Sequence, residues 1–369
     1  MIFFSKENNL ELPKKYNCLT KYVKYFLGIP YLRIKVKNGT EIPYLFDFIK
    51  IPRALVNMLL FLKIKQRQIF SISNIDYHRV IFLFGIQIRS KIKTPKTDIK
   101  VTENGLNSVL RKPRIIASLT TFPERINSVK ETIKTLLTQS VKPDELILWL
   151  AKEQFPTGET SLPKDLLELK KYGLSIKWCK DLKSYKKLVP ALKEYPEDII
   201  ITFDDDIYYD NNVIENLYNS YLDAPHAISA NRSWRLQLSD GRIKPLKAVN
   251  MYWSRYADLS YKNTIIGCGG VLYPPKSLDA RVTDEEAFQS IIPTQDDIWF
   301  WAMAVLNGTK IKVVSSYDMQ IRNVENTQQY GLCKLNKSGK KGLDGSSGFK
   351  TISDAFPELA EKIKGECNE

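Results

Sequence analysis

The chain from about residue 114 onward alternates short apolar runs with longer segments in which apolar residues recur every three or four positions. The short runs predict strands and the longer segments predict amphipathic helices. The run Ile199 to Phe203 is rich in β-branched residues, which indicates a strand buried on both faces, as in a parallel sheet. The other predicted strands are 115–120, 146–150, 174–178 and 309–315, and the predicted helices are 121–137, 162–172, 184–194, 210–221, 293–306 and 352–363. This alternation predicts a doubly wound, Rossmann-like α/β fold with a mostly parallel sheet.

Beyond residue 230 the pattern changes toward hairpins and loops. The segments 233–239 and 242–249 flank Asp240-Gly241, a pair typical of tight turns. An apolar, glycine-rich segment follows at 264–273. Residues 323–348 are rich in Asn, Lys, Gly and Ser, which predicts either a mobile loop over a site or disorder.

Residues 1–112 differ in character and are rich in Lys, Ile, Phe and Tyr. Residues 25–37 and 82–93 form an imperfect repeat of an apolar run, a glycine, and then alternating apolar and basic residues. The repeat predicts bent strands or hairpins with a basic face, which is either a docking surface for a membrane or partner or a small sheet with solvated lysines. The predicted organisation is a small N-terminal β-rich basic module with a linker at 1–112, a main α/β domain at 113–325, and a C-terminal loop with a short helix at 326–369.

Charge and composition narrow the range of partners and chemistry. The formal net charge of +14 indicates an anionic partner, such as nucleic acid, an anionic lipid surface or a phosphorylated substrate. Five cysteines without a CxxC pair disfavour a disulfide framework or a structural zinc site and favour a reducing cytoplasm. With only two histidines, a metal site would have to be made of carboxylates.

No secretory signal pattern is apparent, because Met1 to Phe4 is followed closely by Lys6 and Glu7. The longest apolar run, 54–62, is too short to span a bilayer. Basic residues flank this run, which suits either a core helix, the favoured interpretation, or a helix in a membrane interface. We therefore expect a cytoplasmic protein that associates peripherally, at most, with the inner face of the cytoplasmic membrane.

Three adjacent carboxylates, Asp204, Asp205 and Asp206, follow the strand 199–203 directly. Ligands bind at the carboxyl ends of strands in open α/β sheets, and three like charges there favour a bound cation. Oxygen ligands suit Mg²⁺ or Mn²⁺, which also bind substrate phosphates. Asp210 is the predicted N-cap of the next helix. The alternative to a cation site is a solvated acidic turn that caps this helix. The strand before and the helix after the acids favour the cation site.

Together these segments resemble the GT-A-fold glycosyltransferases, and more narrowly the bacterial enzymes that build capsule, lipopolysaccharide or other surface glycans. The resemblance covers residues 114–328, and its matching pieces are SLTTFPERI at 118–126, KKLVPAL at 186–192, ITFDDDIYY at 201–209, GCGGVLYPP at 267–275 and QDDIWFWA at 295–302. It implies that a sugar is transferred from a nucleotide-diphosphate sugar, with UDP expected as the carrier, to a hydroxyl of a glycan or lipid-linked acceptor. It also implies assistance by Mn²⁺ or Mg²⁺. A carboxylate near the acceptor favours inversion at the sugar carbon, and retention stays open as the alternative.

The resemblance assigns roles to residues along this site. Asp204 and Asp206 form the metal-binding DxD pair, and Asp205 is expected to accept hydrogen bonds from the ribose. For Thr121 and Glu124, capping of the following helix is the favoured interpretation. The residues expected to bind the donor are Thr120, Thr121, Phe122, Arg125, Asp181, Lys187, Asp204 and Asp205.

Asp296 and Asp297 are the predicted catalytic carboxylates, with Asp297 as the general base that deprotonates the acceptor hydroxyl. Acids are favoured at helix N-termini whatever their function, but neighbouring acids also raise one pKa, as a base requires. Trp299 offers an aromatic surface for a sugar, although buried aromatics are more often core. The residues expected to bind the acceptor are Gly269, Gly270, Trp299 and Arg232.

Two alternatives stay open. A sugar nucleotidyltransferase would carry a glycine-rich, basic loop after its first strand, which TTFPERI does not provide. A non-enzymatic basic protein would bind anionic glycan or nucleic acid, but no nucleic-acid-binding module is recognisable, so no nucleic-acid partner is expected. Neither histidine is placed as the third metal ligand found in many GT-A enzymes, which leaves the coordination of the metal open.

Overall fold

The computed structural model describes residues 99–239, 241–245, 258–314, 321–330 and 345–366, and the backbone of seven strands between Cys18 and Lys91. The chain divides into two compact units, residues 1–97 and 98–369, and each is described by itself. The apolar run 54–62 lies outside the described residues.

The first unit contains two antiparallel sheets. Their strands are β1 (Cys18–Phe26), β2 (Ile29–Lys37), β3 (Thr40–Leu45) and β4 (Ile49–Lys50) in one sheet, and β5 (Phe70–Ile75), β6 (His78–Leu83) and β7 (Ile86–Lys91) in the other. Phe26 pairs with Ile29, and Leu83 pairs with Ile86. Each copy of the imperfect repeat therefore spans a hairpin, as the pattern predicts.

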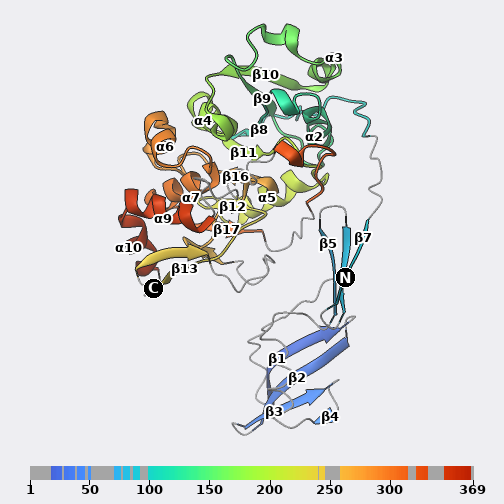
Figure 1. Ribbon diagram of the computed structural model, residues 1–369, viewed down its shortest axis with the longest axis vertical. Helices are drawn as coiled ribbons and strands as arrows, with labels where there is room; N and C mark the ends of the chain where they lie inside the picture. The colour runs from blue at the N-terminus through green and yellow to red at the C-terminus, as the bar shows by residue number, and fades with distance from the viewer. Residues whose placement is uncertain are drawn as a thin grey trace. The chain divides into compact units, whose positions relative to one another are not determined.

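The second unit is built on an eight-stranded sheet (Figure 1). Its strand order is β10 (Leu174–Cys179), β9 (Glu145–Ala151), β8 (Ile115–Thr120), β11 (Ile199–Phe203), β16 (Val271–Tyr273), β12 (Ile228–Ala230), β17 (Ile311–Val313) and β15 (Leu259–Ser260). In this sheet only β16 and β15 are antiparallel to the other strands. The predicted fold class is confirmed: the domain is mixed α/β with a mostly parallel, Rossmann-like sheet, consistent with the GT-A fold.

Side chains of the central strands alternate between two hydrophobic cores. Ile116 and Ile200 face one core, and Ala117 and Ile201 face the other. The helices that pack into the first core include α4 (Val189–Glu194), α7 (Asp296–Leu306), α9 (Gly345–Ala355) and α10 (Glu358–Gly365), and those in the second include α2 (Val129–Leu136) and α5 (Val213–Asp223). Because both faces of β8 and β11 are covered, their carboxyl ends are where these strands can present polar groups.

Several predicted helices are interrupted. The segment 162–172 forms α3 (Lys164–Leu167) and the 3₁₀ helix η3 (Glu168–Tyr172) rather than one helix, and a further 3₁₀ turn, η2 (Gly158–Ser161), precedes it. Pro190 lies in the first turn of α4, where a missing N–H is tolerated, and Pro357 separates α9 from α10. The remaining elements are η1 (Pro123–Arg125), η4 (Lys183–Lys187), β13 (Leu236–Ser239), β14 (Arg242–Pro245), η5 (Gly267–Gly269), η6 (Ala280–Thr283), α6 (Glu285–Ile291) and η7 (Gln328–Tyr330).

Two predicted helix caps are wrong. Helix α5 starts at Val213 with Asn212 at its N-cap position, and the carboxylate of Asp210 accepts a hydrogen bond from Arg322 instead. Thr121 does not cap a helix either, because the first turn after β8 is η1, which has no side-chain cap. The hydroxyl of Thr121 is directed to the acidic motif, which makes it part of the site described next.

Candidate active site

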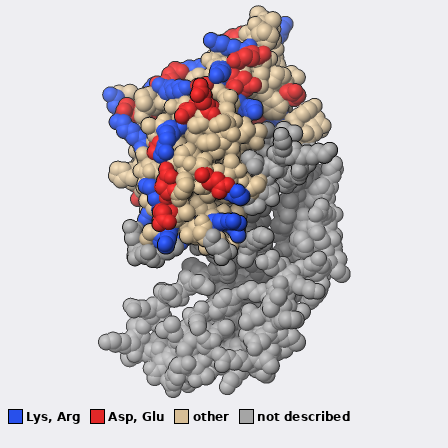
Figure 2. Space-filling model, turned by 60° about the vertical axis from the view of Figure 1, so that its left-hand side comes forward, with Lys and Arg blue, Asp and Glu red and all other residues tan. Residues whose placement is uncertain are grey.

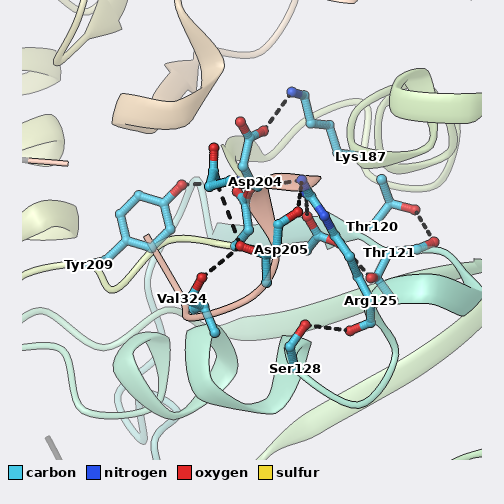
Figure 3. Close-up of polar contacts among 12 residues, drawn as sticks. Thr120, Thr121, Arg125, Ser128, Lys187, Asp204, Asp205, Tyr209 and Val324 are labelled. Carbon is cyan, nitrogen blue, oxygen red and sulfur yellow. Dashed lines mark hydrogen bonds and ion pairs between the residues drawn. The ribbon is translucent and has the colours of Figure 1, made fainter. Parts of the chain in front are cut away.

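The candidate site lies where the two central parallel strands end. Leu119 of β8 pairs with Phe203 of β11, so the residues that follow these strands emerge side by side. Thr121 follows β8, and the run Asp204 to Asp206 follows β11. Figure 3 shows Thr121, Arg125, Asp204 and Asp205 converging on this edge of the sheet.

Asp205 is held inside the protein by its neighbours. Its Oδ2 accepts a hydrogen bond from the hydroxyl of Thr121, and its Oδ1 lies 2.6 Å from Nη1 of Arg125. Burial raises the pKa of Asp205, and the charge of Arg125 opposes that shift. Both oxygens are engaged within the fold, so the expected contact of Asp205 with a ribose is not favoured by this geometry. Asp205 instead holds the side chains of Thr121 and Arg125 in place after β8.

Asp206 is also buried and receives two contacts on one oxygen. Its Oδ2 lies 2.9 Å from Nη2 of Arg125 and accepts a 2.8 Å hydrogen bond from the amide of Gln328. Burial, together with the charge of Asp205, raises the pKa of Asp206 to about 7, and Arg125 opposes the shift. Among the described residues, the side-chain contacts of Asp206 fall on Oδ2, which leaves Oδ1 for another partner.

A segment from the C-terminal part of the chain, residues 321–330, runs along the acidic motif. The backbone N–H of Val324 donates to the carbonyl of Asp206, and Asn323 forms an antiparallel bridge with Ile207. Nη2 of Arg125 also donates to the carbonyl of Thr327. Of the two predictions for 323–348, a loop over a site is therefore supported for the part up to residue 330. Residues 331–344 lie outside the described chain, and residues 345–348 belong to helix α9, which neither prediction anticipates.

Lys187 joins Asp204 to the carboxylates at the start of α7. Its Nζ lies 2.9 Å from Oδ1 of Asp204, 3.0 Å from Oδ2 of Asp296 and 3.9 Å from Oδ1 of Asp297. Burial by itself lowers the pKa of this ammonium group, but the three carboxylates outweigh burial and raise the pKa. Lys187 therefore stays charged and serves as an internal counter-ion, rather than reaching outward to donor phosphates as expected.

Asp296 and Asp297 occupy different environments, although they are adjacent. The side chain of Asp296 is 9% exposed, and that of Asp297 is 33% exposed. Oδ2 of Asp297 accepts a 2.9 Å hydrogen bond from the backbone N–H of Gly267. Desolvation by the surrounding protein raises the pKa of Asp297 to about 7, with Asp296 contributing and Lys187 opposing. A carboxylate with that pKa is suited to take a proton near neutral pH.

The glycine-rich segment allows close packing around these charges. A Cβ on Gly267 would lie 2.8 Å from both Oδ1 of Asp297 and Nζ of Lys187. A Cβ on Gly269 would lie 2.7 Å from Cγ of Arg232. Gly270 adopts φ = +83°, a conformation that residues with a side chain rarely adopt. The glycines thus bring Arg232 and the Asp297 cluster against the same backbone.

The other residues expected to bind the donor lie farther along the strand ends. The Thr120 hydroxyl donates to the carbonyl of Trp149. Asp181 accepts a hydrogen bond from Gln154 and lies 3.3 Å from the buried ammonium of Lys186. The ring of Phe122 lies below the guanidinium of Arg125, 5.4 Å from its carbon to the ring centroid.

Trp299 does not reach the site. Its side chain is fully buried, packs edge-to-face against Phe288 and Phe356, and donates its indole N–H to the carbonyl of Val282. The expectation that Trp299 stacks on a sugar is therefore wrong, because helix α7 turns this face into the core. Trp234 is a better aromatic candidate: it is 38% exposed and follows Arg232, and its carbonyl accepts from Thr264 beside the glycine-rich segment.

The site carries more negative than positive charge. Five carboxylates, Asp204, Asp205, Asp206, Asp296 and Asp297, are accompanied by two cationic side chains, Arg125 and Lys187. Within the described part of the chain, no group of three or more His, Cys, Asp or Glu side chains is arranged to hold a metal by itself. A divalent cation here would need further oxygen ligands from a substrate or water.

The described surface shows no concentration of one charge on the face in Figure 2, where Lys and Arg alternate with Asp and Glu. No helix in the described residues is long and apolar enough to cross a membrane. Residues 1–97 contain 18 Lys and Arg but only 5 Asp and Glu, so most of the net charge of +14 belongs to the first unit.

Comparison with known proteins identifies similar shapes but no family. No protein-family model matches the chain, and no curated protein matches it. A structure of S. aureus TarS 1–349 is 14% identical with a TM-score of 0.36, covering 56% of this chain and 59% of its own. The mannosyltransferase PcManGT from Pyrobaculum calidifontis, in complex with GDP-Man and Mn²⁺, is 13% identical with a TM-score of 0.40, covering 73% of this chain and 77% of its own. At these values neither similarity bears on substrate or mechanism, and the proposal that follows rests on the geometry of the site.

Proposed function

We propose that this chain is a GT-A-type glycosyltransferase that moves a sugar from a nucleoside-diphosphate sugar, with UDP as the expected carrier, to a hydroxyl of a glycan or lipid-linked acceptor. The observation that carries the proposal is the chain of contacts from Asp204 through Lys187 to Asp296 and Asp297. These contacts place the acidic motif, whose oxygens suit a cation, close to Asp297, whose carboxylate can accept a proton. Sugar transfer needs both groups close together, because the cation would bind the donor diphosphate while Asp297 takes the proton of the acceptor hydroxyl.

The residues present fit a divalent cation, Mn²⁺ or Mg²⁺. Asp204 and Asp206 would hold it, because Asp204 is 30% exposed and Asp206 has its described contacts on one oxygen only. Cations of this kind are commonly bound by one or two carboxylates together with substrate phosphates. The excess of carboxylates over cationic side chains also favours added positive charge. When bound, the cation would stabilise the negative charge of the departing nucleoside diphosphate.

The proposed reaction is a single displacement. Asp297 takes the proton of the acceptor hydroxyl, and the hydroxyl oxygen forms a bond to the anomeric carbon of the donor sugar. The bond between that carbon and the diphosphate oxygen breaks, and its electron pair leaves with the nucleoside diphosphate. Because the hydroxyl attacks opposite the leaving group, the configuration at the anomeric carbon is inverted. Asp296 stays buried as the counter-ion of Lys187.

The acceptor would lie beside the glycine-rich segment. Arg232 fills the space beside Gly269, and Phe203 and Leu217 fill the space beside Gly270, so the acceptor sugar would contact Arg232 rather than the two glycines. Trp234 adds a partly exposed aromatic ring on the strand-like segment that pairs with residues 264–266. Aromatic rings with one polar edge commonly line binding sites. A surface-glycan acceptor, of the capsule or lipopolysaccharide type, and a peripheral position at an anionic leaflet would suit the net charge of +14.

A thermal-shift panel tests the proposal. UDP-, GDP-, CMP- and dTDP-sugars are each measured with and without Mn²⁺, and a donor at a hundred times its Kd should add about 2.7 kcal/mol of stability. We expect one nucleotide to stabilise the protein only with Mn²⁺, and Asp206→Asn to abolish the effect. Asp223→Asn is the matched control, since that carboxylate is 76% exposed and far along α5. A panel without any stabilising donor would contradict the proposed function.

A further inference from the structure

The two oxygens of the Asp297 carboxylate have different surroundings. Oδ2 accepts the hydrogen bond from the backbone N–H of Gly267. Oδ1 is buried, has no hydrogen-bond partner among the described residues, and lies 3.9 Å from Nζ of Lys187. Because Oδ1 is buried, Oδ2 is the carboxylate oxygen that remains for an incoming hydroxyl.

Gly267 and Lys187 together account for this orientation. The ammonium group of Lys187, held by Asp204 and Asp296, attracts Oδ1 toward the interior. The N–H of Gly267 fixes Oδ2 on the other side. The missing side chain of Gly267 is what brings the three groups together, since a Cβ there would lie 2.8 Å from both Oδ1 and Nζ. Real Cβ atoms do not approach polar atoms so closely, so any side chain at 267 would displace one of the two.

We propose that Gly267 and Lys187 are positioning residues, which hold Asp297 so that Oδ2 faces the acceptor hydroxyl and Oδ1 faces the interior. The inference rests on the proposed function, because it assigns the orientation of the proposed base. It also gives Lys187 a role different from binding phosphate. Asp296 then acts through Lys187, as the buried carboxylate that keeps the ammonium group in place.

The first test is a double-mutant cycle between residues 267 and 297, with kcat and the KM for the donor as the measured quantities. In the otherwise wild-type protein, Gly267→Ala should lower kcat at least tenfold while the KM for the donor changes less than twofold. In the Asp297→Asn background the same substitution should change kcat less than twofold, because the group it positions is already absent. Equal losses in the two backgrounds would overturn the proposal, since Gly267 would then act independently of Asp297.

A matched glycine separates this effect from a general cost of adding a methyl group. Gly365 lies near the end of α10, and a Cβ there would meet no atom within 4 Å. Gly365→Ala should therefore retain the wild-type kcat. Lys187→Arg should retain more activity than Lys187→Met, because it keeps the positive charge. The reverse order would contradict the role given to the ammonium group.

A crystal structure of the Gly267→Ala protein tests whether Gly267 positions the Asp297 carboxylate, even if no sugar transfer is detected. We expect Oδ2 of Asp297 to move beyond roughly 3.5 Å from the backbone nitrogen of residue 267, outside hydrogen-bonding distance. An unmoved carboxylate would overturn the inference. Wild-type protein that transfers no sugar from any donor would instead contradict the proposed function, and the two failures are thus distinguishable.

Discussion

Nη2 of Arg125 lies 2.9 Å from Oδ2 of Asp206, and Nη1 of the same guanidinium lies 2.6 Å from Oδ1 of Asp205. One side chain from the turn after β8 therefore neutralises part of the acidic motif after β11. All three side chains are at most 10% exposed. The resemblance assigns Arg125 to donor binding, whereas the geometry makes Arg125 the counter-ion of Asp205 and Asp206.

Removal of this counter-ion should destabilise the fold strongly. Arg125→Met leaves two buried carboxylates without their partner, and the loss of one member of a buried ion pair typically costs about 3–5 kcal/mol. The measurement is the free energy of unfolding in urea. Lys170→Met is the matched control, because Lys170 forms an ion pair with Glu159 in which both side chains are 43% exposed. That pair should contribute less than about 1 kcal/mol, and equal losses for the two variants would contradict the prediction.

The raised pKa of Asp297 predicts how the transfer rate depends on pH. A general base works only when it is deprotonated, so kcat should be high above pH 7 and should fall as the pH is lowered through about 7. Below that point the rate should decline about tenfold per pH unit. The profile is measured at saturating donor and Mn²⁺. In Asp297→Asn the remaining rate should lose this dependence, and an unchanged profile would mean that another group titrates.

Two tryptophans should respond to substitution in opposite ways. Trp234→Ala should leave stability almost unchanged, because the residue is partly exposed, and should raise the KM for the acceptor roughly 2- to 10-fold through the loss of an aromatic contact. Trp299→Ala should lower the free energy of unfolding by about 3–5 kcal/mol, because that side chain is fully buried in the core. Urea unfolding and acceptor titrations measure the two effects. A wild-type acceptor KM in Trp234→Ala would remove Trp234 from the acceptor site.

The sequence predicts the strands and the acidic motif because both are local. The β-branched run 199–203 and the carboxylates that follow it are adjacent in the chain, and their periodicity is visible without the fold. The partners of that motif are not local. Arg125 lies 80 residues before Asp205, and Gln328 lies 122 residues after Asp206. No periodicity or spacing marks such pairs, so their roles follow only from the arrangement of β8, β11 and the segment 321–330.

The wrong prediction that Trp299 binds a sugar has a different cause, which is the composition of its helix. The run after Asp297 is almost entirely apolar, and residues 298–305 of α7 are buried without exception. A helix that is apolar all round is normally buried, so this composition indicates a core position rather than a binding surface. Trp234, in contrast, lies near the start of the segment 233–239, whose pattern predicts one arm of a hairpin, but its position beside residues 264–266 depends on backbone pairing that the sequence does not signal.

The C-terminal helices should matter for activity because α9 packs over the start of α7. A Cβ on Gly348 of α9 would lie 1.9 Å from Oε1 of Gln295 and 2.7 Å from Cδ1 of Ile298. Gln295 is at the N-cap position of α7, directly before Asp296 and Asp297. Gly348→Ala should therefore lower the free energy of unfolding by about 1–3 kcal/mol, the usual cost of overpacking a core. It should also lower kcat, because a shift of Gln295 moves the two carboxylates that follow.

Gly365→Ala again provides the control, since it adds the same methyl group in open space on α10. Urea unfolding and initial rates at saturating donor are compared for the two variants. If Gly348→Ala were destabilised but kept the wild-type kcat, α9 would support the fold without affecting the base. If it matched Gly365→Ala in both measurements, the close contact with Gln295 would have no consequence. The expected combination, reduced stability together with reduced kcat, would show that the position of Asp297 depends on a helix contributed some fifty residues later in the chain.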